Sequence, residues 1–366
     1  MASEFVIAGL GTELPRHRIS QSDSAALAGS LSSATSEQQR KLAALYRSTG
    51  VQTRGSVLLE SRIDGPAVPQ SFYPPQRSPE DRGPSTAERM QRYEDEARVM
   101  AFEACRSALS ASGCDPLRIT HLVTVSCSGF SAPGVDIELM NRLALSANVM
   151  RTHVGFMGCH GAINGLRVAQ AHAAADPGAV VLLCAVELCS LHQQYGWHSE
   201  RLVANALFSD GAAAVVGHSR TANAETRPRL IATGAGIVPD TTDLMSWRIG
   251  DHGFEMTLSP RVPDAIRRSL RPWLSAWLES HGLTIDSVGS WAIHPGGPRI
   301  LTAVAEAAGF DEAHLRVSRS VLAECGNMSS PTILFILDRL WREQAPGPCV
   351  VLAFGPGLAI EAALFA

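Results

Sequence analysis

The chain has 366 residues, of which 45% are hydrophobic, and its formal net charge is -4. This length allows one large core or two fused domains. The small net charge, without any block of like charges, argues against nucleic acid as a partner. The N-terminus lacks the basic start and apolar run of a signal peptide, and no stretch has the length of a membrane span. We therefore expect a cytoplasmic protein.

The eight cysteines are scattered through apolar segments. Their spacing is neither that of a zinc site nor that of a disulfide framework. This pattern predicts reduced thiols in a cytoplasmic setting and no metal site. At least one of these thiols is then available for chemistry.

Short runs rich in Val, Ile and Leu alternate with longer helical patterns along the chain. Continuous apolar runs suit strands that are covered on both faces. The alternation predicts an α/β architecture in which helices sandwich sheets. A long helix over 85–112 opens with a capping box formed by Ser85 and Glu88. The predicted strands are Phe5–Leu10, Thr120–Ser126, Ala179–Val186, Ala212–Val216, Leu230–Ala235, Ser287–Ile293 and Cys349–Phe354.

Two irregular segments interrupt this alternation. The segment 63–84 is rich in proline and polar residues, which predicts a long surface loop. The polar segment 218–228 follows a strand of glycine and alanine. We interpret it as the link between two halves, 1–220 and 221–366.

Cys159 lies between a short apolar strand pattern and a helical pattern. This places the thiol at the positive, N-terminal end of a helix, where the dipole and the free N–H groups favour a thiolate. A thiolate is a good nucleophile toward a thioester. A small buried cysteine without a chemical role also fits this segment.

His294 ends an apolar strand pattern and precedes the rigid turn Pro-Gly-Gly-Pro. Catalytic groups of α/β proteins commonly lie at such strand ends. A structural histidine is the alternative.

Asn327 follows a glycine turn and precedes a predicted helix over 332–342, where Pro331 suits the first turn. An asparagine here also fits a role in capping or bracing the turn. Cys159, His294 and Asn327 thus each occur at a turn that joins a strand or loop to a helix.

Four motifs together resemble the chalcone synthase, or type III polyketide synthase, family. They are His-Pro-Gly-Gly-Pro at 294–298, Gly-Asn-Met-Ser-Ser at 326–330, Leu-Phe-Ser-Asp-Gly at 207–211 and Phe-Gly-Pro-Gly at 354–357. The resemblance runs from about Lys41 to the C-terminus. It implies the thiolase fold, in which two similar α/β halves form a five-layered αβαβα sandwich, and a homodimer.

The same resemblance assigns a task to each of the three residues. Cys159, paired with His294, would take a starter acyl group from coenzyme A. His294 and Asn327 would donate hydrogen bonds to a malonyl-CoA carbonyl, whose oxygen becomes an enolate as carbon dioxide leaves. The extended chain would then cyclise to a pyrone, a resorcinol or a related aromatic. This chemistry uses coenzyme A thioesters as substrates and needs no metal or redox cofactor.

Phe208 matches a family gatekeeper between the coenzyme A tunnel and the cavity. A second gatekeeper falls on Met256, with Phe254 two residues away. Plant members carry threonines where Cys127, Cys189 and His192 stand, so a plant-like flavonoid product is not expected. The residues that the resemblance places at the substrate cavity, besides the gatekeepers, are Cys127, Glu187, Cys189, His192, Ser329, Gly355 and Pro356.

Coenzyme A phosphates should meet cations at the tunnel mouth. Lys41, which is the single lysine of the chain, matches one family phosphate contact. Two further basic positions of the family fall on uncharged residues, and the neighbouring Arg47 is the candidate that replaces them.

Three other functions remain open from the sequence. A ketoacyl synthase-like enzyme would take its extender from an acyl carrier protein, and would want a basic docking patch that is not evident here. A cysteine thioesterase would use the same Cys and His to release free acid. A non-catalytic scaffold of the same fold would carry an unreactive Cys159.

Overall fold

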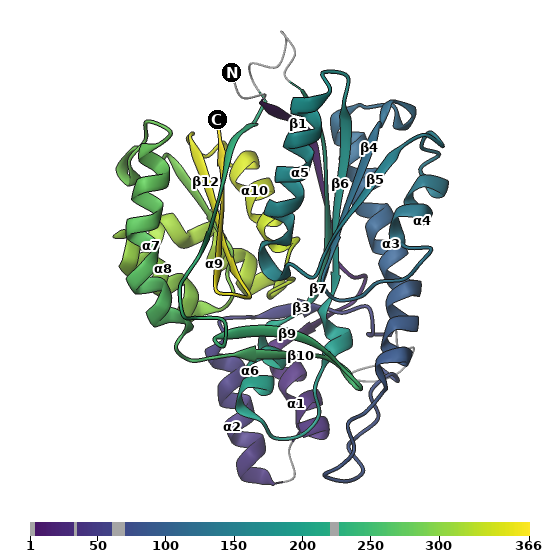
Figure 1. Cartoon of the computed structure of the whole chain (residues 1–366). Helices are drawn as coiled ribbons and strands as arrows, with labels where there is room; N and C mark the ends of the chain where they lie inside the picture. The colour runs from purple at the N-terminus through teal and green to yellow at the C-terminus, as the bar shows by residue number, and fades with distance from the viewer. Residues whose placement is uncertain (1–3, 33–34, 61–69, 220–226) are drawn as a thin grey trace.

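The computed structural model describes residues 4–32, 35–60, 70–219 and 227–366 (Figure 1). Within these residues a nine-stranded sheet runs in the order β11-β12-β13-β8-β1-β7-β6-β4-β5. Strands β4, β5 and β6 are mutually parallel, as are β11 and β12, whereas the central strands pair antiparallel. The strands are β1 (Phe5–Glu13), β4 (His121–Ser126), β5 (Met150–Gly155), β6 (Val180–Leu188), β7 (Asp210–Ser219), β8 (Arg229–Ile237), β11 (Ser290–Ile293), β12 (Cys349–Gly355) and β13 (Ala359–Phe365).

The sheet consists of two half-sheets that meet only at β1 and β8. Their antiparallel pairing is short, with Phe5 opposite Leu230 and Val6 opposite Arg229. From this contact the two half-sheets diverge and enclose a middle layer of helices (Figure 1). The predicted boundary between the halves, at residues 220 and 221, lies outside the described residues.

Helices fill three layers around the two half-sheets (Figure 1). The middle layer contains α5 (Gly161–Ala175) and α10 (Thr332–Arg342), with α9 (Glu312–Cys325) beside α10. One outer layer contains α3 (Thr86–Ser112) and α4 (Val135–Arg142), and the other contains α7 (Val262–Glu279) and α8 (Pro298–Ala308). The structure therefore has the expected five layers, αβαβα.

Three separate hydrophobic cores correspond to the spaces between these layers. The central core joins α5 and α10 to both half-sheets, through residues such as Ile163 and Leu334. A second core packs α3 on the N-terminal half-sheet, and a third packs α7 and α8 on the C-terminal one. Strands buried on both faces explain the continuous apolar runs of the sequence.

Several local predictions are confirmed by the structure. Helix α3 begins after Ser85, whose side chain forms the expected capping box with Glu88. Helix α10 begins after Pro331, and α5 begins at Gly161, two residues after Cys159. The seven predicted strands are all present, and β5 is the short strand expected before Cys159, whereas β13 and a hairpin of β9 (Met245–Gly250) and β10 (Gly253–Leu258) were not foreseen.

Smaller elements cover the end of the molecule at which the parallel strands β4–β6 and β11–β12 end. They include α1 (Gln21–Ser32), α2 (Ser36–Ser48), α6 (Ser199–Leu207), the β9–β10 hairpin, and the paired strands β2 (Arg18–Ser20) and β3 (Thr53–Gly55) (Figure 1). The predicted surface loop over 63–84 is described from residue 70 onward, where it forms neither helix nor strand. Its Tyr73 is buried, so this loop contributes to the interior as well as to the surface.

Within the described residues, no helix combines the length and the apolarity that crossing a bilayer requires.

Candidate active site

Cys159 lies in a single 3-10 turn, Gly158–His160, that leads from β5 into α5. The position at the N-terminal end of the helix is as predicted, and the residue is buried. The chain reaches this turn through Phe156, which has a positive φ of 59° although it is not glycine. Such strained backbone is found where surrounding packing enforces it, commonly at functional sites.

The protonation state of Cys159 differs from the prediction. Burial raises the pKa of the thiol to about 11, although nearby Ser329 and Asn327 act to lower it. The cost of burying a charge thus outweighs the helix dipole in the unliganded site. The expectation of a resting thiolate is therefore wrong, and the thiol must lose its proton when it reacts.

His294 lies directly after β11, and its backbone is held by hydrogen bonds from its N–H to the Leu352 carbonyl and from the Gly296 N–H to its own carbonyl. Both ring nitrogens are buried without a hydrogen-bond partner among the described residues. Burial, and secondarily the charge of His160, lower the pKa of His294 to about 3. The imidazole is therefore neutral near pH 7.

Asn327 presents a buried amide N–H2 group to the same space. Its Oδ1 accepts a hydrogen bond from the Ser329 backbone N–H at 2.8 Å, which fixes the amide so that Nδ2 points away from this turn. Nδ2 lies near the Cys159 thiol but makes no hydrogen bond of good geometry. Buried polar groups are nearly always paired, so an unpaired one at a cavity indicates a place for a ligand atom.

Cys159, His294 and Asn327 meet at one small cavity, as the sequence predicted. Its volume is about 20 Å³, which is room for one or two water molecules. A thioester substrate does not fit this space unless a wall moves. The other lining residues are Phe208, Met245, Met256, Leu258, Gly296, Ile300 and Phe354.

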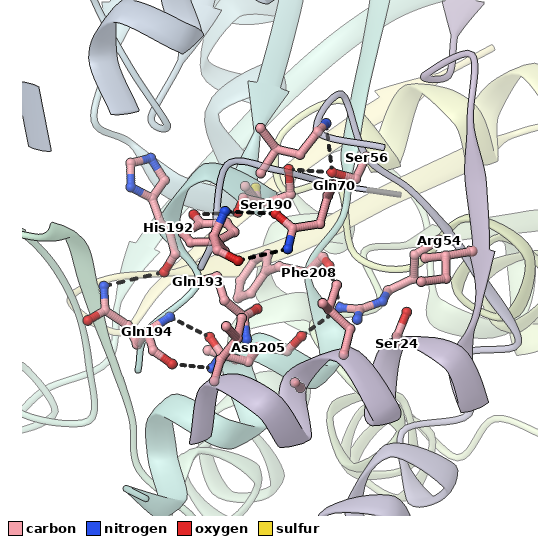
Figure 2. A pocket seen from close by; sticks show the side chains of 18 of the residues that line it. Ser24, Arg54, Ser56, Gln70, Ser190, His192, Gln193, Gln194, Asn205 and Phe208 are labelled. Atoms are coloured by element: carbon pink, nitrogen blue, oxygen red, sulfur yellow. Dashed lines mark hydrogen bonds between the residues drawn. The ribbon is translucent and has the colours of Figure 1, made fainter. Parts of the chain in front are cut away.

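A larger cavity of about 90 Å³ lies on the other side of Phe208 and Met256. Both side chains line the outer and the catalytic cavity, so they form the wall between them. Figure 2 shows Phe208 within the outer cavity, between Arg54 and His192. Much of the rest of its wall is apolar, with leucines from α1 and from the segment after β3.

Phe208 and Asn327 are joined through their backbones. The two residues form an isolated parallel bridge, in which the Asn327 N–H donates to the Leu207 carbonyl and the Ser209 N–H donates to the Asn327 carbonyl, each at 2.9 Å. Phe208, the wall residue from the N-terminal half, is thereby held at a fixed position relative to Asn327, the amide donor from the C-terminal half.

The chain was compared with known families, relatives and solved structures. Residues 2–220 match the N-terminal domain of chalcone and stilbene synthases, and residues 229–366 match their C-terminal domain. This chain belongs to the chalcone and stilbene synthase family of type III polyketide synthases.

Relatives and solved structures agree with this assignment. The chain is 35% identical over 360 residues to a 1,3,6,8-tetrahydroxynaphthalene synthase of Streptomyces peucetius, covering 97% of this chain and 91% of the relative. It is 30% identical to an alpha-pyrone synthesis polyketide synthase-like protein of Mycobacterium tuberculosis, over 98% of this chain and 90% of the relative. The crystal structure of a polyketide synthase from the brown alga Ectocarpus siliculosus superposes with a TM-score of 0.92 at 28% identity, covering 100% of this chain and 98% of the other. The thiolase fold and the polyketide synthase function expected from the motifs are thus confirmed, and the alternatives of a carrier-protein-dependent synthase, a thioesterase and a scaffold are not supported.

In this polyketide synthase, Met256 is part of the wall between the two cavities, and its role as the second gatekeeper stays a prediction. It lies on β10 and lines both cavities, whereas Phe254 is buried against His192 and lines only the outer one. Met is flexible, so this part of the wall can change shape without loss of packing.

His192 and Cys189 line the outer cavity as predicted. The ring nitrogens of His192 are both used within the protein: Nε2 lies 2.6 Å from the Ser128 carbonyl, and Nδ1 accepts from the Phe254 N–H at 2.9 Å. Burial lowers the pKa of His192 to about 3, so the ring is neutral. Its hydrogen-bonding atoms are therefore not available to a substrate, and its ring stacks on Phe254 with centroids 4.2 Å apart.

Trp247 is a cavity residue that the sequence analysis missed. Its indole N–H donates to the Cys127 carbonyl at 2.6 Å, and its ring meets His192 edge-on with centroids 5.4 Å apart. The residue faces Met256 across the β9–β10 hairpin. The sequence offered no signal for it, because neither the hairpin nor its side-chain directions were predicted.

Cys127, Ser329 and Glu187 lie behind the catalytic cavity. The Cys127 sulfur is 3.3 Å from the Ser329 hydroxyl, and burial raises the pKa of this second thiol well above its usual range. Glu187 is fully buried and accepts hydrogen bonds from the backbone N–H groups of 127 and 128 and from the hydroxyls of Ser128 and Ser330. These bonds use both carboxylate oxygens, so Glu187 braces the site. Direct contact of these three residues with substrate stays a prediction.

Gly355 and Pro356 pack on the turn that carries the nucleophile. A Cβ on Gly355 would lie 2.3 Å from the His160 ring, and one on Gly158 would lie 2.8 Å from the Pro356 ring. Only glycine fits at these two close approaches. The neighbouring Phe354, which was not predicted, is the residue of this segment that lines the catalytic cavity.

The predicted coenzyme A contacts line neither cavity. Lys41 is on α2, where it pairs with Glu37 at 2.6 Å with both side chains about two-thirds exposed, and Arg47 is exposed near the end of that helix. The cations that line the outer cavity are Arg54 and Arg201. The role of Lys41 and Arg47 in binding phosphate stays a prediction.

Proposed function

We propose that Cys159 carries the growing acyl chain, and that His294 and Asn327 activate malonyl-CoA. The observation that carries this proposal is the set of groups that meet at one cavity: the buried thiol of Cys159, and beside it two imidazole nitrogens and one amide N–H2 that have no hydrogen-bond partner among the described residues. A thioester carbonyl placed there would accept hydrogen bonds that the protein itself leaves unmade.

Acyl loading needs the thiol proton to leave as the bond forms. The neutral imidazole of His294 takes this proton while the Cys159 sulfur attacks the carbonyl carbon of an acyl-CoA. The carbon–sulfur bond to coenzyme A then breaks, and His294 returns the proton to the departing thiolate. With a thiol pKa of about 11 and an imidazole pKa of about 3, a standing ion pair is unfavourable, so transfer and attack proceed together.

Decarboxylation of malonyl-CoA uses the same groups as hydrogen-bond donors. As the bond to the carboxylate breaks and carbon dioxide leaves, the thioester oxygen becomes an enolate that His294 and Asn327 stabilise. A neutral imidazole N–H donates a hydrogen bond without giving up its proton, so the enolate is not quenched before it reacts. The low pKa of His294 thus serves this step.

Condensation follows when the enolate carbon attacks the acyl–Cys159 thioester. The new carbon–carbon bond displaces the Cys159 sulfur, and the chain, now two carbons longer, remains on coenzyme A. It returns to Cys159 for the next round, and the finished chain cyclises to a pyrone, a resorcinol or a related aromatic. The proposed steps need no metal or redox cofactor.

We place the starter acyl chain in the outer cavity, beyond Phe208 and Met256. Leucines from two segments line this cavity, and its exposed surface is mainly apolar. Such a surface favours an aliphatic chain over a polar one. The leucines are Leu27, Leu31, Leu58 and Leu59.

The test is incubation of the enzyme with malonyl-CoA and a panel of aliphatic and aromatic acyl-CoAs, read by mass spectrometry. We expect extended, cyclised products, with aliphatic starters preferred, and no need for an acyl carrier protein. Release of free acid without carbon dioxide from malonyl-CoA would show a thioesterase instead. Preference for aromatic starters would contradict the placement in the outer cavity alone.

We also propose that the enzyme is a cytoplasmic homodimer that pairs through the edge of its sheet. Strand β5 ends the nine-stranded sheet, and its outer edge has no partner strand among the described residues. Large apolar side chains are exposed on β5 and just after it, namely Met150, Phe156 and Met157. An exposed strand edge with apolar neighbours is stabilised when a second copy covers it.

A further inference from the structure

A buried chain of polar contacts begins at His160, the residue after the proposed nucleophile. His160 Nδ1 lies 2.7 Å from Asn164 Oδ1, and Asn164 Nδ2 donates to Glu361 Oε1 at 3.1 Å. The other oxygen of Glu361 accepts from the guanidinium of Arg167. His160, Asn164 and Glu361 are each buried, so these bonds are shielded from water.

The direction of this chain is set by its charged end. Because the Glu361 carboxylate is held by Arg167, it accepts from the Asn164 amide, which turns Asn164 Oδ1 toward His160. The His160 ring must then donate from Nδ1, which leaves Nε2 as the unprotonated nitrogen of the neutral ring. Every member of the chain has a defined donor or acceptor role, so the His160 ring is fixed in orientation.

These polar contacts join the two halves of the molecule beside the catalytic cavity. His160, Asn164 and Arg167 belong to the N-terminal half, on or next to α5. Glu361 is on β13, and Arg167 also donates to Thr233 Oγ1 at 3.1 Å and to the Gly234 carbonyl at 3.2 Å on β8. The contacts therefore connect the turn that carries Cys159 to the half that supplies His294 and Asn327.

The fixed ring of His160 also touches the active site itself. It lies against the backbone of Gly355, where a Cβ would come within 2.3 Å of ring Cδ2. The preceding residue, Phe354, lines the catalytic cavity. His160 is also near enough to His294 for a positive charge on either ring to disfavour one on the other.

We propose that His160 is a positioning residue, and that the chain His160–Asn164–Glu361–Arg167 holds Cys159 at its working distance from His294 and Asn327. This inference rests on the proposed roles of those three residues. Condensation needs all three groups in register, whereas decarboxylation needs only His294 and Asn327. Loss of these hydrogen bonds should therefore slow condensation and leave decarboxylation unchanged.

The first test is Asn164→Leu, which keeps the shape and removes both hydrogen bonds. We expect kcat for condensation to fall by about tenfold or more, since small misplacements of reacting groups have effects of this size, with KM for malonyl-CoA unchanged. Decarboxylation of malonyl-CoA should stay within about twofold of the wild type. A matched control is Gln170→Met on the same helix, which breaks bonds to the carbonyls of Leu230 and Ile231 farther from Cys159. It should leave the ratio of the two activities unchanged.

The second test separates positioning from folding. His160→Asn keeps an N–H donor at the place of Nδ1 and should retain most of the condensation activity, whereas His160→Leu should lose it. A wild-type ratio of condensation to decarboxylation in His160→Leu, or an equal loss of both activities in a folded variant, overturns the proposal.

A measurement that does not depend on turnover distinguishes the proposed catalytic function from the positioning role of His160. The rate of Cys159 alkylation by iodoacetamide should rise in Asn164→Leu and His160→Leu, because the turn that buries the thiol loosens. It should not change in Gln170→Met. If the wild type fails to condense any acyl-CoA while this labelling pattern holds, the proposed function fails and the positioning role stands. An unchanged labelling rate in both Asn164→Leu and His160→Leu contradicts the positioning role.

Discussion

At the scale of single residues, the site combines groups whose burial sets their protonation. The thiol of Cys159 and the imidazole of His294 are both neutral at rest, because the cavity wall excludes the water that would stabilise their charged forms. The resulting site is a set of neutral donors and acceptors awaiting a substrate, not a preformed ion pair.

The reactivity of Cys159 should therefore depend steeply on pH. Because the thiolate is the reactive form and the pKa of the thiol is raised to about 11, alkylation should accelerate about tenfold for each pH unit between neutral pH and that value. The measurement is iodoacetamide labelling followed by mass spectrometry of the peptide. A rate that levels off near neutral pH would show a stabilised thiolate and contradict the neutral resting state.

Cys159→Ala should abolish acyl loading and retain decarboxylation of malonyl-CoA. His294 remains neutral above its pKa of about 3, so the decarboxylation rate should be constant from about pH 5 to about pH 8 and fall only as the pH approaches that pKa. Carbon dioxide release measures this directly. In the Cys159→Ala background, His294→Ala should lower the rate by about 100- to 1000-fold, as expected for the loss of an enolate donor. Extended product from Cys159→Ala would show that the nucleophile lies elsewhere.

At the scale of elements, the site depends on contacts between segments far apart in the sequence. The Phe208–Asn327 bridge, the Trp247–Cys127 hydrogen bond and the Glu187 carboxylate each connect different turns around the cavities. Glu187 lies on β6 and binds the loop after β4 and Ser330 before α10, so it braces the N-terminal half against the C-terminal one.

Glu187→Gln should destabilise the fold. The amide N–H2 of glutamine would face donors that now point at a carboxylate oxygen, leaving buried groups unpaired at a cost of about 1 to 3 kcal/mol. Chemical denaturation should show an earlier unfolding midpoint. The control is Glu312→Gln, which removes an exposed ion pair with Arg319 and should change stability by less than about 1 kcal/mol. Equal midpoints for the two variants would contradict the bracing role.

At the scale of the whole molecule, the two halves divide the chemistry. The N-terminal half supplies Cys159 and the wall residue Phe208, and the C-terminal half supplies His294, Asn327 and Met256. Their half-sheets share only a short pairing between β1 and β8, so the helices between them and the polar contacts near the site must hold the halves together.

The proposed homodimer should be sensitive to charge on the sheet edge. Met150 is 57% exposed at the start of β5, so Met150→Arg would bring two like charges into a symmetric interface and should weaken the dimer by about tenfold or more. Sedimentation velocity over a concentration series measures this. Val99→Arg, on the exposed face of α3, should leave the mass unchanged. A monomeric wild type at all concentrations would contradict the dimer.

Much of this enzyme could be predicted from the sequence alone. Strand and helix periods predicted an α/β architecture in which helices sandwich sheets, because burial on both faces of a sheet requires continuous apolar runs. The five αβαβα layers were expected from the family resemblance. The turns around Cys159, His294 and Asn327 are short local motifs, so their residue order predicted both the site and the family.

Other features were decided only by the tertiary structure. The pKa of the Cys159 thiol is raised because burial, which depends on the packing of both halves, outweighs the local helix dipole. Trp247 lines the outer cavity because it lies on a hairpin that no sequence periodicity indicated. The cations predicted on α2 to bind coenzyme A do not line either cavity, and Lys41 pairs with Glu37. The hydrogen bonds of His160 were likewise decided by the tertiary structure. Its link to Glu361 crosses between the halves, and a contact between residues almost 200 positions apart leaves no local pattern to read.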